Sequence, residues 1–230
     1  MTRKALAAMA LATALAAAVL LPCCLAAPEK GEAAKDGDGW ISLLPATGDL
    51  EGWKATGNAV WKIKEGVLMG TQTDGRGGDL YTEKEFDNFE LRFTYRVTWP
   101  ANSGVWFRGK YQYDILKWPK PVGYSGTLYM PGYPKTFITV NLKEELEDRD
   151  GWNEGQVYAV GDHLMLWLNG TKTGDCHNKA HAKGPVGIQV HGGEKFKGME
   201  IHLKRLEIRP LKPGDEPTPP LAPRKEAPPQ

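Results

Sequence analysis

Apolar and polar residues alternate along much of the middle of the chain. The clearest case lies at 89–98, where Phe89, Leu91, Phe93, Tyr95 and Val97 are separated by polar or charged residues. A period of two places one set of side chains on the buried face of a β-strand and the other set on the opposite face. We therefore predict a half-buried strand over this segment.

Further strand-like runs follow on both sides of this segment. The run 59–70 carries a Glu65-Gly66 turn, and the run 163–173 carries Asn169-Gly170 between two strand-like halves. Asn-Gly flanked by apolar alternation is a strong signal for a two-residue β-hairpin. Two more runs, 184–192 and 199–209, complete the set, and helical periodicity is nearly absent. Short strands joined by turns predict an all-β fold, an antiparallel sandwich or jelly roll.

The segment "ANSGVWFRGKYQYDIL", residues 101–116, raises the main functional question. In one continuous strand, Trp106, Arg108, Gln112 and Asp114 share a face. A two-residue turn at Gly109-Lys110 instead separates Arg108 from Gln112 and Asp114, whereas a bulge or a longer loop brings them back together. The pattern fits either a solvated sheet face or the floor of a polar binding site.

Three other segments contain candidate site residues. The loop 122–134 is rich in tyrosine and includes Tyr129, whose flat ring and hydroxyl suit a sugar, although a packed loop explains it equally well. Gln189 and His191 lie two residues apart, so they share one face of a predicted strand. Asn153 follows Trp152 at the start of another predicted strand.

Metal and cofactor motifs are weak in this chain. Cys176, His177 and His181 are close in sequence, but a structural zinc site requires four ligands in a recognised spacing. We therefore expect no metal. No glycine-rich phosphate loop, dinucleotide fingerprint or nucleophile elbow occurs, so we also expect no cofactor. The formal net charge of +1 argues against a nucleic-acid partner.

The two ends of the chain differ from its middle. Residues 1–26 combine Arg3 and Lys4, a long apolar run and small residues, which predicts a signal peptide and a secreted or periplasmic protein. A retained membrane anchor and a lipid anchor at Cys23 or Cys24 are the alternatives. We expect a flexible linker over 27–39, one domain over 40–210, and a disordered, proline-rich tail over 211–230.

Several segments taken in order resemble one known family. They include "GWISLLPATGDLEGW", "WKIKEGVLMG", "FDNFELRFTYRV", "NSGVWFR", "YSGTLY", "LWLNGTKTGD" and "GPVGIQVHGGEKFKGMEIHLKRLEI". Their order is similar to that of the 3-keto-disaccharide hydrolase family, over about 39–210. The resemblance implies a concanavalin A-like jelly-roll sandwich, a carbohydrate substrate and cleavage of 3-keto-glycosides by acid–base elimination and hydration.

The resemblance also suggests roles for particular residues. A base removes the proton on carbon 2, which the ketone on carbon 3 acidifies, and we expect Asp114 or His191 in that role. Arg108 would polarise an oxygen through its guanidinium. The remaining roles are to hold hydroxyl groups or to stack on a sugar ring, and their candidates are Trp106, Gln112, Tyr129, Asn153 and Gln189.

This chain departs from the family pattern in one place. After the arginine, the family usually has Tyr-Glu-x-Gln, often followed by an aspartate, whereas here Tyr111-Gln112-Tyr113-Asp114 is followed by Lys117. Either Asp114 takes over the acidic role, or this protein binds sugar without cleaving it. Two alternatives to an enzyme therefore stay open, a non-catalytic carbohydrate-binding module and an interaction protein that uses the sandwich as a scaffold.

Overall fold

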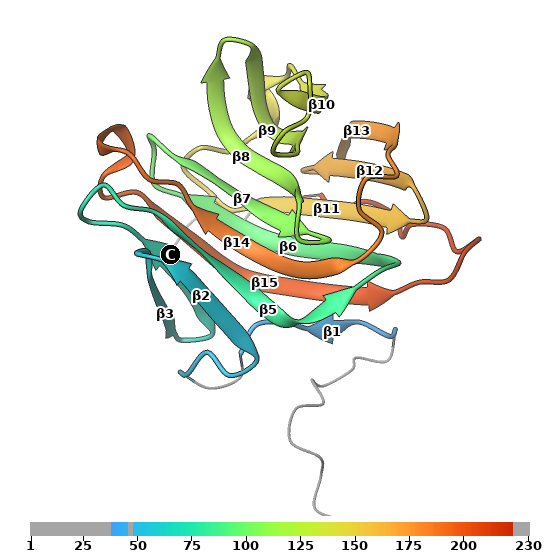
Figure 1. Cartoon of the computed structure of the whole chain (residues 1–230), viewed down its shortest axis with the longest axis horizontal. Helices are drawn as coiled ribbons and strands as arrows, with labels where there is room; N and C mark the ends of the chain where they lie inside the picture. Colours follow the sequence, from blue (N-terminus) through green and yellow to red (C-terminus); the bar gives the residue numbers. More distant parts are fainter. Residues whose placement is uncertain (1–37, 46–47, 223–230) are drawn as a thin grey trace, which may run out of the picture. The chain divides into compact units, whose positions relative to one another are not determined.

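The fold is a sandwich of two antiparallel β-sheets (Figure 1). A computed structural model describes residues 38–45 and 48–222. The predicted signal peptide, both anchor alternatives and most of the predicted linker lie outside these residues. No helix in the described part of the chain has the length and apolar character needed to cross a membrane.

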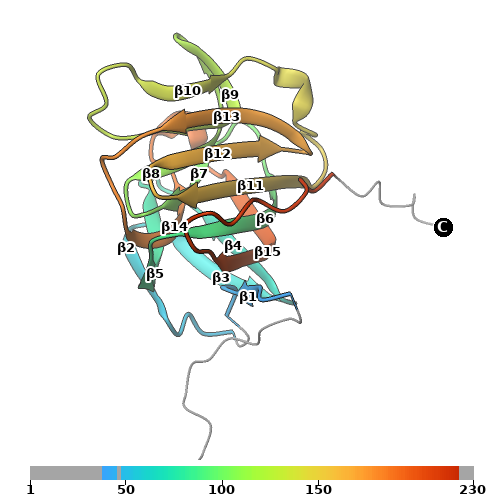
Figure 2. The ribbon, with the colours of Figure 1, turned by 90° about the vertical axis from the view of Figure 1, so that its right-hand side faces the viewer.

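One sheet has the strand order β13-β12-β11-β6-β15-β4-β3, with β1 added on β15. Its strands, all paired antiparallel, are β1 (Ile41–Ser42), β3 (Val60–Lys64), β4 (Val67–Thr71), β6 (Phe89–Val97), β11 (Asn153–Val160), β12 (His163–Leu168), β13 (Thr171–His177) and β15 (Glu200–Pro210). We call it sheet A. Figure 2 faces its outer side.

The second sheet, sheet B, has the order β10-β9-β8-β7-β14-β5-β2. Its antiparallel strands are β2 (Trp53–Gly57), β5 (Gly78–Phe86), β7 (Asn102–Phe107), β8 (Tyr111–Pro119), β9 (Val122–Tyr129), β10 (Phe137–Asn141) and β14 (Gly184–Val190). The described residues also contain two single-turn 3-10 helices, η1 (Glu144–Leu146) and η2 (Glu194–Phe196). The all-β sandwich predicted from the alternation is confirmed.

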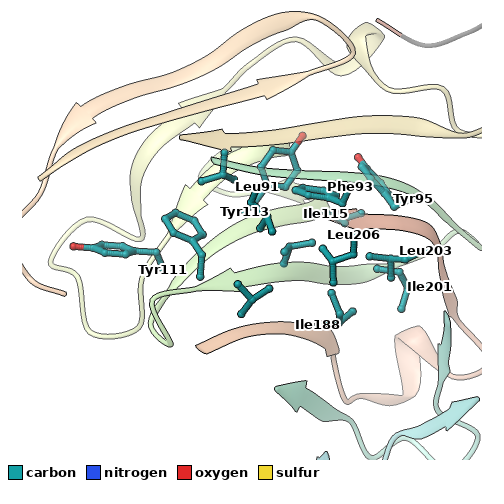
Figure 3. Packing of buried hydrophobic residues seen from close by; sticks show 14 of the residues in the cluster. Leu91, Phe93, Tyr95, Tyr111, Tyr113, Ile115, Ile188, Ile201, Leu203 and Leu206 are labelled. Carbon is teal, nitrogen blue, oxygen red and sulfur yellow. The ribbon is translucent and has the colours of Figure 1, made fainter. Parts of the chain in front are cut away.

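The core lies between the two sheets, where the alternation of the sequence predicts it. Phe93 from β6 meets Tyr113 from β8 edge to face, with ring centroids 5.0 Å apart (Figure 3). Leu91 and Ile115 are likewise fully buried. Each fully buried aliphatic or aromatic side chain contributes about 1.5–3 kcal/mol. The odd-numbered residues from 89 to 95 on β6 and from 111 to 115 on β8 therefore belong to the core, and the even-numbered residues of this part of β8 face outward.

The predicted Asn169-Gly170 hairpin is confirmed between β12 and β13. Asn169 has a φ of 49° and Gly170 a φ of 83°, as a tight turn with two left-handed residues requires. The Asn169 amide also donates to the carbonyl of Leu146, at 2.7 Å. This contact ties the hairpin to the loop that contains η1.

The end of the chain differs from its prediction. Leu211 to Ala222 form no strand, yet they pack on the outer face of sheet A (Figure 2). The backbone N–H and hydroxyl of Thr218 both donate to the buried carboxylate of Glu90, and the Tyr158 hydroxyl donates to the carbonyl of Asp215, at 2.8 Å. The prediction of an unpacked tail is therefore wrong for 211–222, because polar groups on β6 and β11 bind this segment.

Candidate functional site

A cavity of about 430 Å³ opens on the outer face of sheet B. Its floor comes from β7, β8 and β14, and its wall comes from the end of β9 and the loop before β10. Six of the eight candidate residues line it: Trp106, Gln112, Asp114, Tyr129, Gln189 and His191. Sequence reasoning therefore found half of the residues that line this cavity, and their chemical roles stay predictions. The lining residues that it missed are Asn102, Leu116, Trp118, Pro131, Thr136 and Phe137.

The turn between β7 and β8 sets which side chains reach this floor. It contains three residues, so Phe107 pairs with Tyr111, Trp106 pairs with Gln112, and Gly104 pairs with Asp114. This is the longer loop that the sequence allowed as an alternative to a two-residue turn. Trp106, Gln112 and Asp114 consequently lie on one face.

A glycine makes room for the polar residues of this floor. Gly104 lies opposite Asp114 on β8 and opposite Gln189 on β14. A Cβ atom at this position would come within 2.7 Å of the Gln112 side chain. Gly104 is therefore the point at which the amide of Gln112 crosses the backbone of β7.

Asp114 is a buried carboxyl group at the bottom of the cavity. It is 2% exposed, and no side-chain hydrogen bond or ion pair of Asp114 is found within the described residues. Burial raises the pKa of Asp114 well above its ordinary value of 3.8. Burial also raises the pKa of Tyr129, and the negative charge of Asp114 adds to that rise. The environment therefore favours the protonated acid, a hydrogen-bond donor, over the carboxylate base.

Gln112 offers a second donor to the same space. Its side chain is 2% exposed, and its Nε2 atom is buried without a hydrogen-bond partner among the described residues. Buried amide groups are nearly always paired, because leaving one unpaired costs about 1–3 kcal/mol. An oxygen of a bound molecule in the cavity would satisfy this group.

His191 follows β14 at the edge of the cavity. Its Nδ1 atom lies 2.5 Å from the carbonyl oxygen of Gly192, and its ring meets Phe196 edge to face. A carbonyl only accepts, so Nδ1 carries a proton in this contact, and in the neutral imidazole the lone pair is then on Nε2. The solvent-exposed imidazole is therefore available as a base through Nε2.

Four aromatic residues line the cavity, namely Trp106, Trp118, Tyr129 and Phe137. Trp106 and Tyr129 have ring centroids 6.4 Å apart, with their planes tilted by 53°. The Trp106 Nε1–H donates to Oδ1 of Asp79, at 2.7 Å. Asp79 comes to the site because β5 pairs with β14, so that Asp79 lies opposite Gln189, and no local motif in the sequence reveals that pairing.

The placement of Arg108 in the site is wrong. Its side chain is 2% exposed and runs away from the cavity, where Nε donates to the carbonyl of Asp87 at 2.8 Å. Nη1 donates to the carbonyls of Gly161 and His181, at 2.7 and 3.3 Å. Arg108 belongs to the three-residue turn, with a φ of 49°, so its direction differs from that of the strand residues before it. Its guanidinium joins three loops instead of polarising a ligand.

The placement of Asn153 is also wrong, because β11 belongs to sheet A. Its Oδ1 atom accepts from the backbone N–H of Asp148, at 2.8 Å, and from the amide of Asn169, at 2.8 Å. Its Nδ2 donates to the carbonyl of Asp148, at 2.7 Å. These contacts fix the loop that contains η1 and leave little capacity for a ligand.

The cysteine and histidines considered for metal binding make other contacts. His177 contacts Asp162 through Nδ1, at 3.0 Å, and stacks on His163. Burial raises the pKa of the Cys176 thiol to about 11. Across the part of the chain that the structure describes, no three His, Cys, Asp or Glu side chains are grouped as metal ligands.

Comparison with known proteins places nearly the whole sandwich in one family. Residues 39–209 match the family described as the 3-keto-alpha-glucoside-1,2-lyase-like domain. A curated relative from Bacteroides thetaiotaomicron, named 3-keto-disaccharide hydrolase, is 30% identical over 185 residues, which is 73% of this chain. The aligned region spans 60% of the length of that relative.

Solved structures show the same fold at lower sequence identity. A candidate glycosyl hydrolase from Parabacteroides distasonis superposes with a TM-score of 0.54 at 18% identity, covering 75% of this chain and 99% of its own. The carbohydrate recognition domain of Emp47p gives a TM-score of 0.53 at 12% identity, covering 76% of this chain and 97% of its own. At these identities the likeness extends to the jelly-roll fold alone.

Proposed function

The chain belongs to the family of 3-keto-alpha-glucoside-1,2-lyase-like domains, and on that premise we propose that it cleaves 3-keto-glycosides in the cavity of sheet B. The family and the curated relative indicate a carbohydrate hydrolase-like function. The particular substrate and the mechanism are the further content of the proposal. Its main support is that an unpaired buried carboxyl group and an imidazole with a free lone pair line one cavity.

The proposed reaction begins with proton removal at carbon 2 of the sugar. The ketone on carbon 3 acidifies this proton, and Nε2 of His191 accepts it. The electron pair of the C2–H bond forms the C1–C2 double bond, and the C1–O bond to the leaving group breaks. The leaving oxygen takes a proton from Asp114, whose burial keeps it protonated. Water then adds its oxygen to carbon 1 and a proton to carbon 2, so that the net reaction is hydrolysis.

Neighbouring residues orient the sugar for these steps. The Trp106 ring, and the Tyr129 ring tilted against it, offer apolar faces to a sugar ring. The unpaired Nε2 of Gln112 donates to a sugar oxygen. This arrangement assigns the base role to His191 and the acid role to Asp114, and it gives Arg108 no part in the reaction.

The decisive experiment follows product formation from a 3-keto-disaccharide and from the same disaccharide without the ketone. Wild-type protein should release products from the keto sugar alone. Asp114→Asn and His191→Gln should each lower kcat/KM by roughly 10²–10⁴-fold, the usual contribution of a positioned acid or base. Asp175→Asn, on β13 of the other sheet, is the matched control and should keep wild-type activity. Full activity in Asp114→Asn would overturn the proposed acid.

A non-catalytic carbohydrate-binding module is the second candidate. The observation in its favour is the pair of tilted rings, Trp106 and Tyr129, in an open cavity. In that case the protein would bind both sugars with similar affinity and release no product. Calorimetric binding with no turnover of the keto sugar would therefore select the module over the enzyme.

We also propose that the protein is secreted or periplasmic, as the pattern of residues 1–26 predicts. The proposal implies that the protein recovered from the periplasm or the medium lacks this segment. Mass spectrometry of its N-terminus tests this. An N-terminus at Met1 in exported protein would contradict cleavage.

A further inference from the structure

The reaction proposed above gives no role to the hydrogen bond between Asp79 and Trp106. The Trp106 Nε1–H donates to Oδ1 of Asp79 at 2.7 Å, which lies in the range of charge-assisted hydrogen bonds. Trp106 is 6% exposed, and Asp79 is partly buried. A buried indole N–H needs a partner, but a carboxylate is a stronger and costlier partner than packing alone requires.

The strand register shows how far the Trp106 ring reaches. Trp106 on β7 lies opposite Gly187 on β14, and Gly187 lies opposite Tyr81 on β5. Asp79 is on β5 as well, so the indole crosses β14 to reach its partner two strands away. Neighbouring strands are about 4.8 Å apart, so the Trp106 side chain, the hydrogen bond and the Asp79 side chain together span about 10 Å of the sheet. The space over Gly187 itself is filled by the ring of Tyr81, because a Cβ atom there would collide with Tyr81 Cδ1.

The surroundings of Asp79 keep its carboxyl group in a state that can hold the indole. The pKa of Asp79 is raised above its ordinary value, chiefly by burial, and the Trp106 hydrogen bond and a protonated His191 oppose this rise. Whenever Asp79 is ionised, the indole N–H stabilises the carboxylate. An ionised acceptor makes hydrogen bonds about twice as strong as a neutral one.

We propose that Asp79 is a positioning residue that fixes the Trp106 ring as the platform for the sugar, a role that rests on the proposed function. Asp79 does not touch the reacting atoms in this role. It sets the tilt of the indole over β14, and that tilt decides which sugar face packs against the ring. Loss of Asp79 leaves the ring free to rotate, so substrate binding weakens and the chemical step is largely preserved.

Three variants separate the hydrogen bond from other effects. Asp79→Ala removes the acceptor, Asp79→Asn keeps an acceptor oxygen without the charge, and Trp106→Phe keeps an aromatic ring without the donor. Glu83→Gln, exposed on the same strand, is the matched control. The indole N–H resonance of Trp106, assigned from its loss in Trp106→Phe, reports the contact by NMR without any need for turnover.

The expected pattern is specific to positioning. Asp79→Ala should shift the Trp106 indole resonance upfield and raise KM for the 3-keto-disaccharide about tenfold, the equivalent of one charged hydrogen bond, with kcat within about twofold. Asp79→Asn should bring both the indole resonance and KM most of the way back to their wild-type values, and Glu83→Gln should match wild type in both. In Trp106→Phe, a further Asp79→Ala change should raise KM no more, because the two side chains act as one unit.

Two outcomes would overturn the inference. One is an unchanged indole resonance in Asp79→Ala. The other is an equal increase of KM in Asp79→Ala and Asp79→Asn, together with an increase that is fully additive when either change is combined with Trp106→Phe. Failure of the proposed function looks different, since wild-type protein would then turn over neither sugar. If it also binds neither sugar, the platform role is overturned as well, although the indole resonance still responds to Asp79→Ala.

Discussion

Replacing Glu147 by glutamine should stabilise the folded protein above neutral pH. Glu147 follows η1 and lies mostly buried at the edge of the core, where its Oε1 accepts from the Tyr95 hydroxyl at 2.9 Å and its Oε2 from the Ser125 hydroxyl at 2.8 Å. Burial raises the pKa of Glu147 from 4.5 to about 7, against the opposing effect of these hydrogen bonds. The folded protein therefore holds this proton more tightly than the unfolded chain does.

The magnitude follows from the size of this shift. Each pKa unit corresponds to about 1.4 kcal/mol, so a rise from 4.5 to about 7 amounts to roughly 3 kcal/mol at most. Because the folded pKa is the higher one, this stability is fully present below about pH 4.5 and is lost as the pH rises through about 7. Glutamine imitates the protonated acid at every pH, so the variant avoids this loss.

Urea unfolding of wild type and Glu147→Gln across this pH range is the assay. The two proteins should have nearly equal free energies of unfolding at about pH 4.5, and the variant should be about 2–3 kcal/mol more stable at about pH 8.5. Ionisation of Asp114 also lowers the free energy of unfolding as the pH rises, but this effect is the same in both proteins. Glu145→Gln, exposed in the same loop, should follow wild type. A pH-independent difference between wild type and Glu147→Gln would refute the reasoning.

The floor of the cavity and the turn beside it yield two further predictions. Gly104→Ala should lower kcat/KM roughly 10–100-fold, because a Cβ atom 2.7 Å from the Gln112 side chain displaces that side chain. Gly48→Ala is the control, since a Cβ atom there has nothing within 4 Å. Equal activities of the two variants would contradict the close contact between Gly104 and Gln112. Arg108→Lys should cost about 2–3 kcal/mol in urea unfolding, because one ammonium group cannot bond the carbonyls of Asp87 and Gly161 together. The KM of Arg108→Lys should stay at the wild-type value, and a raised KM would contradict the conclusion that Arg108 does not bind the substrate.

The alternation of the sequence was sufficient to predict the faces of the strands. It left the length of the turn at Gly109-Lys110 open, and the three-residue turn of the structure is what puts Trp106, Gln112 and Asp114 on one side of the hairpin. This works because a strand has only two faces, so a residue's parity decides its direction once the turn length is known. The Asn169-Gly170 hairpin was predictable for a related reason, since few residue pairs adopt two consecutive left-handed conformations.

The failures came from information that the local sequence lacks. Arg108 adopts a positive φ, which is uncommon outside glycine, and one such residue lengthens the turn and redirects the side chain. Asn153 was expected in the site although its strand belongs to sheet A, because alternation does not say which strands are neighbours. Asp79 was missed for the same reason, since only the pairing of β5 with β14 brings it beside Gln189.

The segment Leu211–Ala222 has a practical consequence for handling the protein. A chain truncated after Pro210 would lose the cover of an apolar cluster on sheet A that includes Tyr158 and Trp167, and the carboxylate of Glu90 would be left without Thr218. Expression boundaries should therefore fall beyond Leu221, whose N–H still bonds to β11. This segment lies on the face of the sandwich opposite the cavity, so a surface-immobilised protein tethered through it keeps the cavity open to soluble sugars.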